Sequence, residues 1–308
     1  MADVIIVGAG VMGASTAFHL AERGLDVLIL DRDGPSAGST ARSAALVRAH
    51  YSTALEADLA WESLTDYFER WGDRVGGGCG FTRTGFAFLA AEKDAEKLVA
   101  NVSMLKREVG VETDVLGPER ITEIDAAFAP DGVAVAAHEP RGGYADPTAT
   151  TLGFLRAAQR LGARFERRRV TGLSERGGRV TGVNTPEGSI GAKAVVLCSG
   201  AWSVGLAAGV GLKLPIRPAR VQVALFERPY SLPTHLTFID SVNEGAAVGP
   251  PPTAAPSSAC ASPSSSGSTT QIVGAPKPTR PSYEPPVGVW AGGSPPLEAL
   301  AIAPGGRG

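Results

Sequence analysis

The stretch Asp3-Val4-Ile5-Ile6-Val7-Gly8-Ala9-Gly10-Val11-Met12-Gly13 decides the fold of this 308-residue chain. A short apolar run of strand composition leads into a glycine-rich turn, and residues 14–23 then fit a helix. Gly24 ends that helix, and a second apolar run, residues 27–30, ends at Asp31. The order strand, turn, helix, strand predicts the start of a parallel sheet of the α/β class.

The three glycines of the turn have the spacing that dinucleotide binding requires. Gly8 allows the tight turn, Gly10 lets a pyrophosphate approach the backbone, and Gly13 lets the helix pack closely on the sheet. The helix N-terminus then offers free N–H groups and a positive dipole end to the phosphates. Asp31 follows Gly13 by 18 positions, near the spacing of an acid that bonds a ribose hydroxyl. The alternative is an ordinary strand–turn–helix unit that binds no ligand. The agreement of the flanking segments favours a dinucleotide-binding site instead.

Composition narrows the class of protein. The net charge of −2 gives no reason to expect a nucleic-acid partner. Cys79, Cys198 and Cys260 are scattered, without a CxxC pair or metal-ligand spacing, which favours a reducing compartment and no bound metal. The N-terminus lacks the pattern of a signal peptide, and the uncharged residues 245–276 are broken by prolines and serines. We expect a cytoplasmic protein that does not associate with a membrane.

The distance to the next parallel strand separates two kinds of nucleotide fold. The next run that could lie beside residues 27–30 is 163–165, 132 residues after Asp31. A nicotinamide-binding domain would continue its strand–helix repeat in register. An inserted substructure therefore favours a flavin fold, and an NAD(P)-dependent dehydrogenase is the weaker alternative.

The remaining pattern predicts further helices and strands. Asp146-Pro147 gives one helix a capping acid followed by proline at its favoured first position. Residues 246–308 hold 13 of the 23 prolines and show no period of 2 or 3.6, so we expect 245–308 to be disordered. The expected helices are 53–71, 95–109, 147–161 and 201–209; the expected strands are paired runs over 81–90 bent near Gly85, then 133–137, 164–165, 170–173, 179–184, 189–192, 195–197 and 214–226.

Several motifs together resemble the FAD-dependent amine oxidoreductases of the D-amino-acid oxidase and sarcosine oxidase type. Their order and spacing match that family over roughly residues 3–240. The glycine turn occurs in many flavoproteins, but the set as a whole is specific. The other motifs are GSTARS at 38–43 followed by Arg48, GGYADP at 142–147, VVLCSGAW at 195–202 and PIRPARVQ at 215–222.

The resemblance implies a Rossmann-like FAD-binding domain of the GR2 type with an inserted α+β substrate domain on a mixed sheet. The FAD domain would comprise 1–80 and 141–212, and an incomplete substrate domain 81–140 and 213–244. The family's last glycine-rich strand and helix are not recognisable after about Asp240. We expect 245–308 to be out-of-frame or otherwise foreign sequence on a truncated enzyme.

The resemblance also implies which residues hold FAD. Ala41 and Arg42 stand where some relatives carry a flavin-linked histidine, so we expect non-covalent binding. The implied contacts are Gly8, Gly10, Met12 and Gly13 around the pyrophosphate, Asp31 on the adenosine ribose, Arg32 beside adenine, Ser39 and Thr40 at the pyrophosphate or ribityl chain, Arg42 at a phosphate or flavin edge, the Val170 backbone at adenine, and Ser199 and Gly200 close to the cofactor.

Two residues are candidates for substrate binding. Arg48 lies where relatives place an arginine beside the flavin, and a guanidinium binds a carboxylate through two parallel hydrogen bonds. The alternative is a surface arginine on the way to Tyr51. Tyr144 could hydrogen-bond the substrate, or its motif could be only a turn. His50 could exchange protons, but a histidine without a partner motif is more often structural.

The sequence thus predicts an FAD-dependent oxidoreductase. It would oxidise the C–N bond of a small amine or amino acid, resembling sarcosine, dimethylglycine or a D-amino acid, by hydride transfer to flavin. Oxygen or an electron-transfer protein would be the acceptor. The alternative is a truncated, inactive remnant that at most binds a nucleotide.

Overall fold

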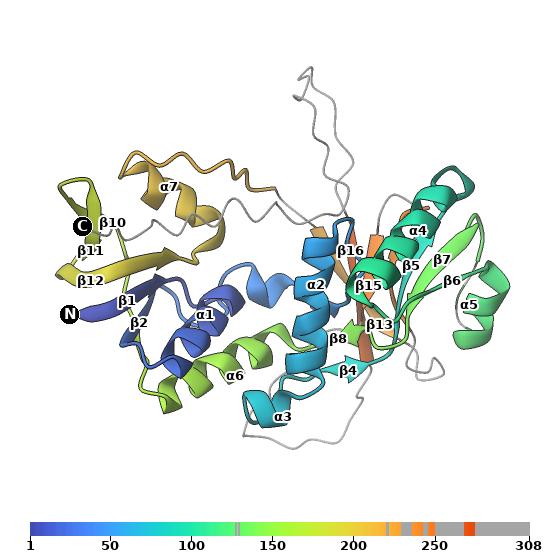
Figure 1. Ribbon diagram of the computed structural model, residues 1–308, viewed down its shortest axis with the longest axis horizontal. Coiled ribbons are helices and arrows are strands. Elements are labelled where there is room, and N and C mark those ends of the chain that lie inside the picture. The colour runs from blue at the N-terminus through green and yellow to red at the C-terminus, as the bar shows by residue number, and fades with distance from the viewer. Residues whose placement is uncertain are drawn as a thin grey trace.

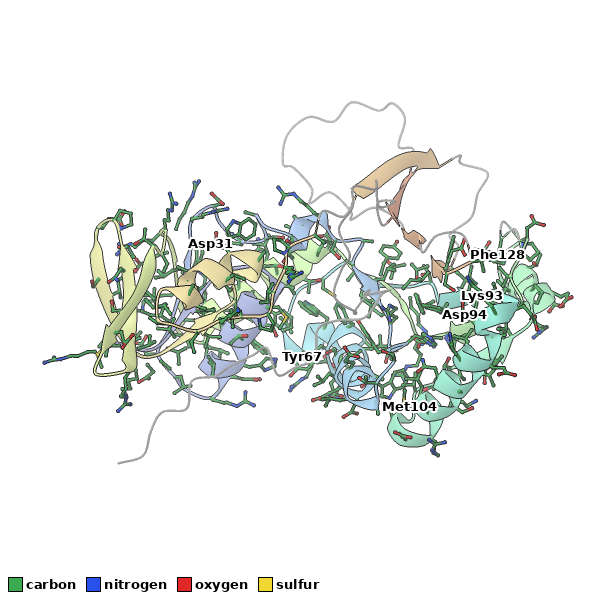
Figure 2. The ribbon with its side chains drawn as sticks, turned by 90° about the horizontal axis from the view of Figure 1, so that it is seen from above. Asp31, Tyr67, Lys93, Asp94, Met104 and Phe128 are labelled. Carbon is green, nitrogen blue, oxygen red and sulfur yellow. The ribbon has the colours of Figure 1, made fainter. Side chains whose placement is uncertain are left out.

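The computed structural model describes residues 1–126, 128, 130–219, 222–228, 236–242, 246–249 and 268–274. Its strands form three sheets of six, seven and three strands. The six-stranded sheet lies at one end of the long axis and the seven-stranded sheet at the other, with the three-stranded sheet between them (Figure 1). In Figure 2, Asp31 lies in the half of the molecule that holds the six-stranded sheet, and Phe128 lies near the opposite end.

The six-stranded sheet contains the strands of the N-terminal motif. Its order is β10-β11-β12-β1-β2-β9, and β12, β1, β2 and β9 run parallel. Arg164 of β9 pairs with Leu28 of β2, so the chain returns to this sheet after the long interruption, as the sequence predicted. The elements are β1 (Ala2–Val7), α1 (Val11–Glu22), β2 (Val27–Asp31), β9 (Arg164–Arg167), β10 (Gly172–Arg176), β11 (Arg179–Thr185) and β12 (Gly188–Leu197).

One long strand replaces two predicted short ones. We expected separate strands at 189–192 and 195–197, but β12 is continuous. Its first part pairs antiparallel with β11, up to Gly191 opposite Gly182, and its second part pairs parallel with β1 from Ala192 onward. The strand therefore changes partner between Gly191 and Ala192.

Apolar side chains fill both faces of the six-stranded sheet. On one face, Phe18 of α1 packs beside Phe154 of α6 (Pro147–Arg160), with ring centroids 5.6 Å apart. On the other face, Ile5 and Leu30 are fully buried with Val183. Burying one such side chain stabilises a fold by about 1.5–3 kcal/mol. The predicted cap of α6 is confirmed, because the Asp146 carboxylate accepts the N–H groups of residues 148 and 149 at 2.8 Å.

Helical segments lead away from this sheet. The predicted helix 53–71 is split into α2 (Ala54–Glu62), a π-helical stretch (Ser63–Phe68) and α3 (Trp71–Arg74). The single 3.6-residue period read from the sequence was therefore wrong in its second half. Trp71 is nonetheless buried, with its ring 4.8 Å from Phe154.

The three-stranded sheet joins the two larger sheets. Its central strand β8 (Gly143–Tyr144) pairs antiparallel with β3 (Leu46–Val47) and with β4 (Thr82–Arg83). We expected the run 81–90 to pair with itself, which is wrong, because β4 and β5 (Phe86–Ala90) belong to different sheets. Gly85 between them has φ +79°, a left-handed conformation that redirects the chain.

The seven-stranded sheet is mixed, as the family resemblance implied. Its order is β13-β16-β15-β14-β5-β7-β6, with β14 parallel to β5 and the other neighbours antiparallel. Helix α4 packs on one face and α5 on the other. The elements are α4 (Glu92–Met104) with a π-helical end (Leu105–Val109), β6 (Asp114–Leu116), α5 (Pro118–Ile124), β7 (Val135–Glu139), β13 (Gln222–Arg228), β14 (Thr237–Asp240), β15 (Ala246–Gly249) and β16 (Ser268–Gly274).

Three predictions concern the C-terminal part. Two segments of the stretch expected to be disordered, β15 and β16, are strands, so that expectation does not extend to them. The rest of 245–308 lies outside the described residues. The strand expected at 214–226 begins only at Gln222. The domain boundaries expected from the resemblance stay predictions. Within the described ranges, no helix has both the length and the apolar composition to cross a bilayer.

Candidate functional site

The glycine turn after β1 has the geometry that its sequence predicted. Gly8 has φ +109°, and a Cβ there would lie 2.5 Å from the carbonyl oxygen of Cys198. A Cβ on Gly13 would lie 1.9 Å from the Gly8 carbonyl oxygen, because α1 packs directly on the turn. Side chains at either position would collide with backbone, so the turn needs glycine at both.

The start of α1 is covered by one small polar group. Gly10 is extended and supplies no side-chain cap. The Thr40 hydroxyl accepts the Val11 N–H at 3.2 Å and would lie 3.0 Å from a Cβ on Gly10. Met12 points outward, with 58% of its surface exposed. In the part of the chain that the structure describes, no bulky side chain lies within 4 Å of a Cβ built on Gly10, and Thr40 lies against the helix terminus that would bind phosphate.

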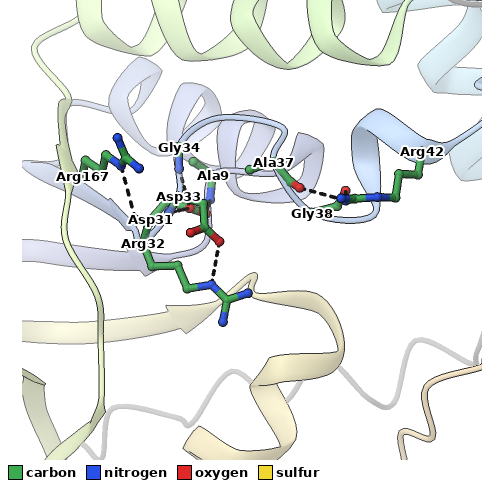
Figure 3. A network of polar contacts seen from close by, with 9 residues as sticks. All are labelled: Ala9, Asp31, Arg32, Asp33, Gly34, Ala37, Gly38, Arg42 and Arg167. Atoms are coloured by element: carbon green, nitrogen blue, oxygen red, sulfur yellow. Dashed lines mark hydrogen bonds and ion pairs between the residues drawn. The ribbon is translucent and has the colours of Figure 1, made fainter.

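Asp31 links the end of β2 to this turn. One carboxylate oxygen accepts the Ala9 N–H at 2.8 Å, and the other accepts the N–H groups of Asp33 and Gly34 at 2.9 Å each (Figure 3). The side chain is half-buried, and a carboxylate has about four acceptor positions. Asp31 therefore lies beside the glycine turn, with capacity to accept a further hydrogen bond.

The loop after β2 carries the other residues expected near the phosphates. Arg42 is exposed and folds back on this loop, donating to the carbonyls of Ala37 at 2.9 Å and Gly38 at 2.5 Å (Figure 3). Ser39 is exposed and precedes a short 3-10 turn, Thr40–Arg42. Arg42 thus holds the shape of the loop that brings Thr40 to α1.

A second loop, after β12, lies beside the first. Ser199 follows the strand, and its hydroxyl is 2.9 Å from that of Ser203, the first residue of α7 (Ser203–Ala208). Gly200 has φ +56°. Trp202, to which we gave no role from the sequence, is half-exposed, and the Arg32 guanidinium lies 4.9 Å from its ring centroid. A cation over an aromatic face joins the two loops.

Val170 lies away from these loops along the chain. It precedes β10, is half-buried and packs against the apolar core behind β1 and β12. Its side chain therefore contributes to the core, and only its backbone would be available to a ligand.

These residues meet at one edge because their strands are parallel. β1 ends at Val7, β2 at Asp31 and β12 at Leu197, so the glycine turn and both loops follow carboxyl ends of neighbouring strands. In open parallel α/β sheets, ligands bind in the crevice beyond these ends. The open turn, the nearby carboxylate and the small hydroxyl side chains fit a dinucleotide diphosphate.

The two candidate substrate residues lie at neighbouring strands of the three-stranded sheet, one just after β3 and the other in β8. Arg48 follows β3 directly, and Tyr144 of β8 pairs with Leu46 of β3. The Arg48 guanidinium donates to the His50 carbonyl and lies 4.3 Å from the ring centroid of Tyr51. Both Arg48 and Tyr144 are half-buried. The pairing of β3 with β8 therefore places the backbone of Arg48 near that of Tyr144.

His50 is enclosed. It is 6% exposed, and its ring stacks on Phe88 with the centroids 4.9 Å apart. Nε2 lies 3.3 Å from the side-chain nitrogen of Asn101. Burial, and then the charge of Arg48, lower the pKa of His50 to about 4, so the ring is neutral at physiological pH.

Glu139 is a buried acid that sequence reasoning missed. It ends β7, is 1% exposed and accepts the Ala49 N–H at 2.8 Å through Oε2. Burial raises the pKa of Glu139 to about 7, against the Ala49 hydrogen bond and the charge of Arg48, which lower it. The one sequence signal was an acid at the end of an apolar run, directly before Pro140.

The described residues contain no cluster of three or more metal-ligating side chains. The parallel sheet, its glycine turn and the acid at the end of β2 define a dinucleotide-binding protein of the α/β class. Residues 3–250 match the model of the family described as FAD dependent oxidoreductase. The chain belongs to this family, whose members bind FAD.

Similar proteins include dehydrogenases and oxidases. The chain is 28% identical to human mitochondrial sarcosine dehydrogenase, over 70% of this chain and 24% of that protein. It is 30% identical to glycine oxidase of Pseudomonas putida, over 73% of this chain and 62% of that protein. It is also 27% identical to the mouse mitochondrial pyruvate dehydrogenase phosphatase regulatory subunit, over 75% of this chain and 27% of that protein. The chain therefore spans about a quarter of the length of several curated relatives that it matches.

Solved structures share the fold. L-proline dehydrogenase from P. horikoshii matches with a TM-score of 0.77 at 22% identity, covering 92% of this chain and 73% of that one. Glycine oxidase from Geobacillus kaustophilus matches with a TM-score of 0.69 at 25% identity, covering 89% of this chain and 70% of that one.

Proposed function

We propose that this chain binds FAD non-covalently and oxidises the C–N bond of a small amine or amino acid of the sarcosine, dimethylglycine or D-amino-acid type. One observation supports this most directly. The loop after β2 that brings Thr40 to α1 leads into β3, which Arg48 follows directly and whose small sheet carries Tyr144. The relatives named sarcosine dehydrogenase and glycine oxidase suggest the substrate class.

The cofactor would be held mainly by backbone groups. The glycine turn and the first N–H groups of α1 would bind the diphosphate, with Thr40 beside them. Asp31 would accept a ribose hydroxyl while keeping its bond to Ala9. The other proposed contacts are Gly8, Gly10, Met12 and Gly13 at the diphosphate, Arg32 beside adenine, Ser39 and Arg42 on the loop after β2, the Val170 backbone, and Ser199 and Gly200 after β12.

Bound flavin would accept the hydride equivalent from the carbon next to the amine nitrogen. The protein's own residues would contribute to this reaction by positioning the substrate and by supplying charge. Arg48 would bind the substrate carboxylate through its planar fork, already oriented by the His50 carbonyl and the Tyr51 ring. Tyr144 would offer its hydroxyl from the neighbouring strand. The neutral His50 would not donate a proton at physiological pH.

The visible spectrum of the purified chain tests this function. We expect flavin absorption near ~450 nm that bleaches on anaerobic addition of sarcosine, dimethylglycine, glycine or D-alanine. Re-admitting oxygen, or adding an artificial electron acceptor, would then distinguish an oxidase from a dehydrogenase. A colourless protein that stays colourless with added FAD contradicts the proposal. The physiological acceptor and the cytoplasmic location remain predictions.

A non-catalytic role is the second candidate, in which the chain binds the nucleotide without turnover. It is favoured by the 27% identity to a protein named a regulatory subunit. A flavin that is bound but is not bleached by any amine supports this candidate over the enzyme.

A further inference from the structure

A polar cluster of two buried and two half-buried residues lies where the three-stranded sheet meets the seven-stranded sheet. It contains Arg48, His50, Asn101 and Glu139. Glu139 ends β7 and pairs with Phe86 of β5, so its side chain shares the α4-covered face of the sheet with residues 88 and 137. Through Ala49 it contacts the segment that carries Arg48, 90 positions earlier in the chain.

Only one carboxylate oxygen of Glu139 has a hydrogen-bond partner. Oε2 accepts the Ala49 N–H, whereas Oε1 is buried without a partner among the described residues. An ionised carboxylate left in this way costs several kcal/mol, so the site favours the protonated acid. Consistent with this, the pKa of Glu139 is raised to about 7.

Arg48 is the charged group that acts on Glu139. Its guanidinium lies 5.5 Å from the ring centroid of Phe86, the residue paired with Glu139. No described carboxylate lies within ion-pair distance of Arg48. The guanidinium charge is therefore not compensated by a direct partner and can bind a ligand carboxylate.

The other titratable groups on the elements around Glu139 are neutral, paired elsewhere or exposed to solvent. On the Arg48 segment, His50 is neutral above about pH 5. On β7, His138 alternates to the opposite face, and burial lowers its pKa. Beyond β7, Arg141 pairs with the carboxylates of residues 69 and 112. On α4, Asp94 pairs with Lys97. The neighbouring side chains Glu92, Lys93 and Glu96 are exposed, and Figure 2 labels Lys93 and Asp94 on this helix.

We infer that Glu139 is a positioning residue that sets the affinity of Arg48 for substrate carboxylates by gaining or losing a proton. When Glu139 is protonated, the full charge of Arg48 attracts the ligand. When Glu139 is ionised, it competes with the ligand for that charge. Binding a carboxylate beside Arg48 therefore makes the Glu139 carboxylate take up a proton from solvent. The inference rests on the proposed role of Arg48 and adds the group that regulates it.

Calorimetric titration of the full-length, FAD-loaded protein with acetate tests the inference without turnover. Heats measured in buffers of different ionisation enthalpy give the protons taken up on binding. At pH 7.5 we expect roughly half a proton per acetate, and an apparent affinity that falls about tenfold between pH 6 and pH 8.5. Glu139→Gln keeps an acceptor for the Ala49 N–H but cannot ionise, so it should show no proton uptake and a flat affinity.

Two further variants act as controls. Glu112→Gln removes an exposed carboxyl outside the cluster and should behave as the wild type. Arg48→Met should abolish acetate binding, which locates the site. Acetate binding without proton uptake in the wild type, uptake that persists in Glu139→Gln, or no acetate binding at all each overturns the inference. A colourless preparation contradicts the proposed function instead, and the same acetate titration of that preparation still decides the inference.

Discussion

The carboxylate of Asp31 accepts the backbone N–H of Ala9 at 2.8 Å, which joins the end of β2 to the glycine turn after β1. Two more backbone N–H groups, of Asp33 and Gly34, bond the other oxygen. The acid expected to bind ribose thus also fastens the glycine turn and the start of the following loop to the end of β2.

Asp31→Ala should lower both stability and FAD affinity, because three backbone donors lose their acceptor. The stability loss should be about 1–3 kcal/mol, since these groups are partly solvated once the carboxylate is gone. Urea unfolding of the cofactor-free chain and quenching of flavin fluorescence measure the two effects. Asp33→Ala is the control, because Asp33 is exposed and pairs with the exposed Arg32. An equal loss of FAD affinity in both variants would contradict this role of Asp31.

Two glycine variants should separate folding from cofactor binding. In Gly13→Ala the new methyl group would collide with the Gly8 carbonyl at 1.9 Å, so we expect a loss above about 3 kcal/mol or no folding. In Gly10→Ala the methyl group would meet, among the described residues, only the Thr40 hydroxyl at 3.0 Å, so the chain should fold but bind FAD at least about tenfold more weakly. Circular dichroism and FAD titration check the pair. Wild-type FAD affinity in Gly10→Ala would exclude the diphosphate from this turn.

Arg48→Lys should weaken the binding of amino-acid substrates while keeping the charge. Lysine cannot form the bidentate fork, so KM should rise by about ten- to a hundredfold with a smaller change in kcat. An amine substrate without a carboxylate is the control, and its KM should change little. Equal effects on both substrates would show that Arg48 acts on the fold instead.

Ionisation of Glu139 should make the free energy of unfolding depend on pH. Its pKa is about 7 in the folded chain, above the unfolded value near ~4.3, so stability is lost as the pH rises from about 4.3 through 7. Between pH 5 and pH 8.5 the loss should be on the order of 2–3 kcal/mol, and Glu139→Gln should remove it. Urea unfolding between pH 5 and pH 8.5 measures the difference.

His50 should affect the pH dependence of the free energy of unfolding at low pH. Its pKa of about 4 lies below the unfolded value near ~6.5, so stability is lost as the pH falls from about 6.5 to 4. His50→Gln should flatten that limb. An unchanged acid limb in this variant would contradict the burial of a neutral ring.

The glycine turn could be predicted because its chemistry is local. Gly8 and Gly13 are needed by backbone contacts within a few residues and with the strand beside them. The spacing also indicated that Asp31 would lie at the crevice, but not that it would bond Ala9, since that contact depends on how β1 and β2 align.

Non-local pairing explains what could not be predicted. The separation of β4 from β5 depends on partners at 143–144 and 135–139, far away in sequence. β12 read as two strands because Lys193 interrupts its apolar pattern, although this side chain pairs with Asp3 on the neighbouring strand at 2.6 Å. Glu139 looked like an ordinary strand end, because its burial depends on a segment 90 residues earlier.

The change of partner along β12 has a consequence for biosynthesis. β1 lies between two strands. β2, on one side, is synthesised directly after β1, whereas β12, on the other side, is complete only at Leu197. Until the ribosome has released nearly two hundred residues, β1 presents an unpaired apolar edge of the kind that invites aggregation. A nascent chain halted before residue 188 should therefore need a chaperone, and it could not retain the nucleotide.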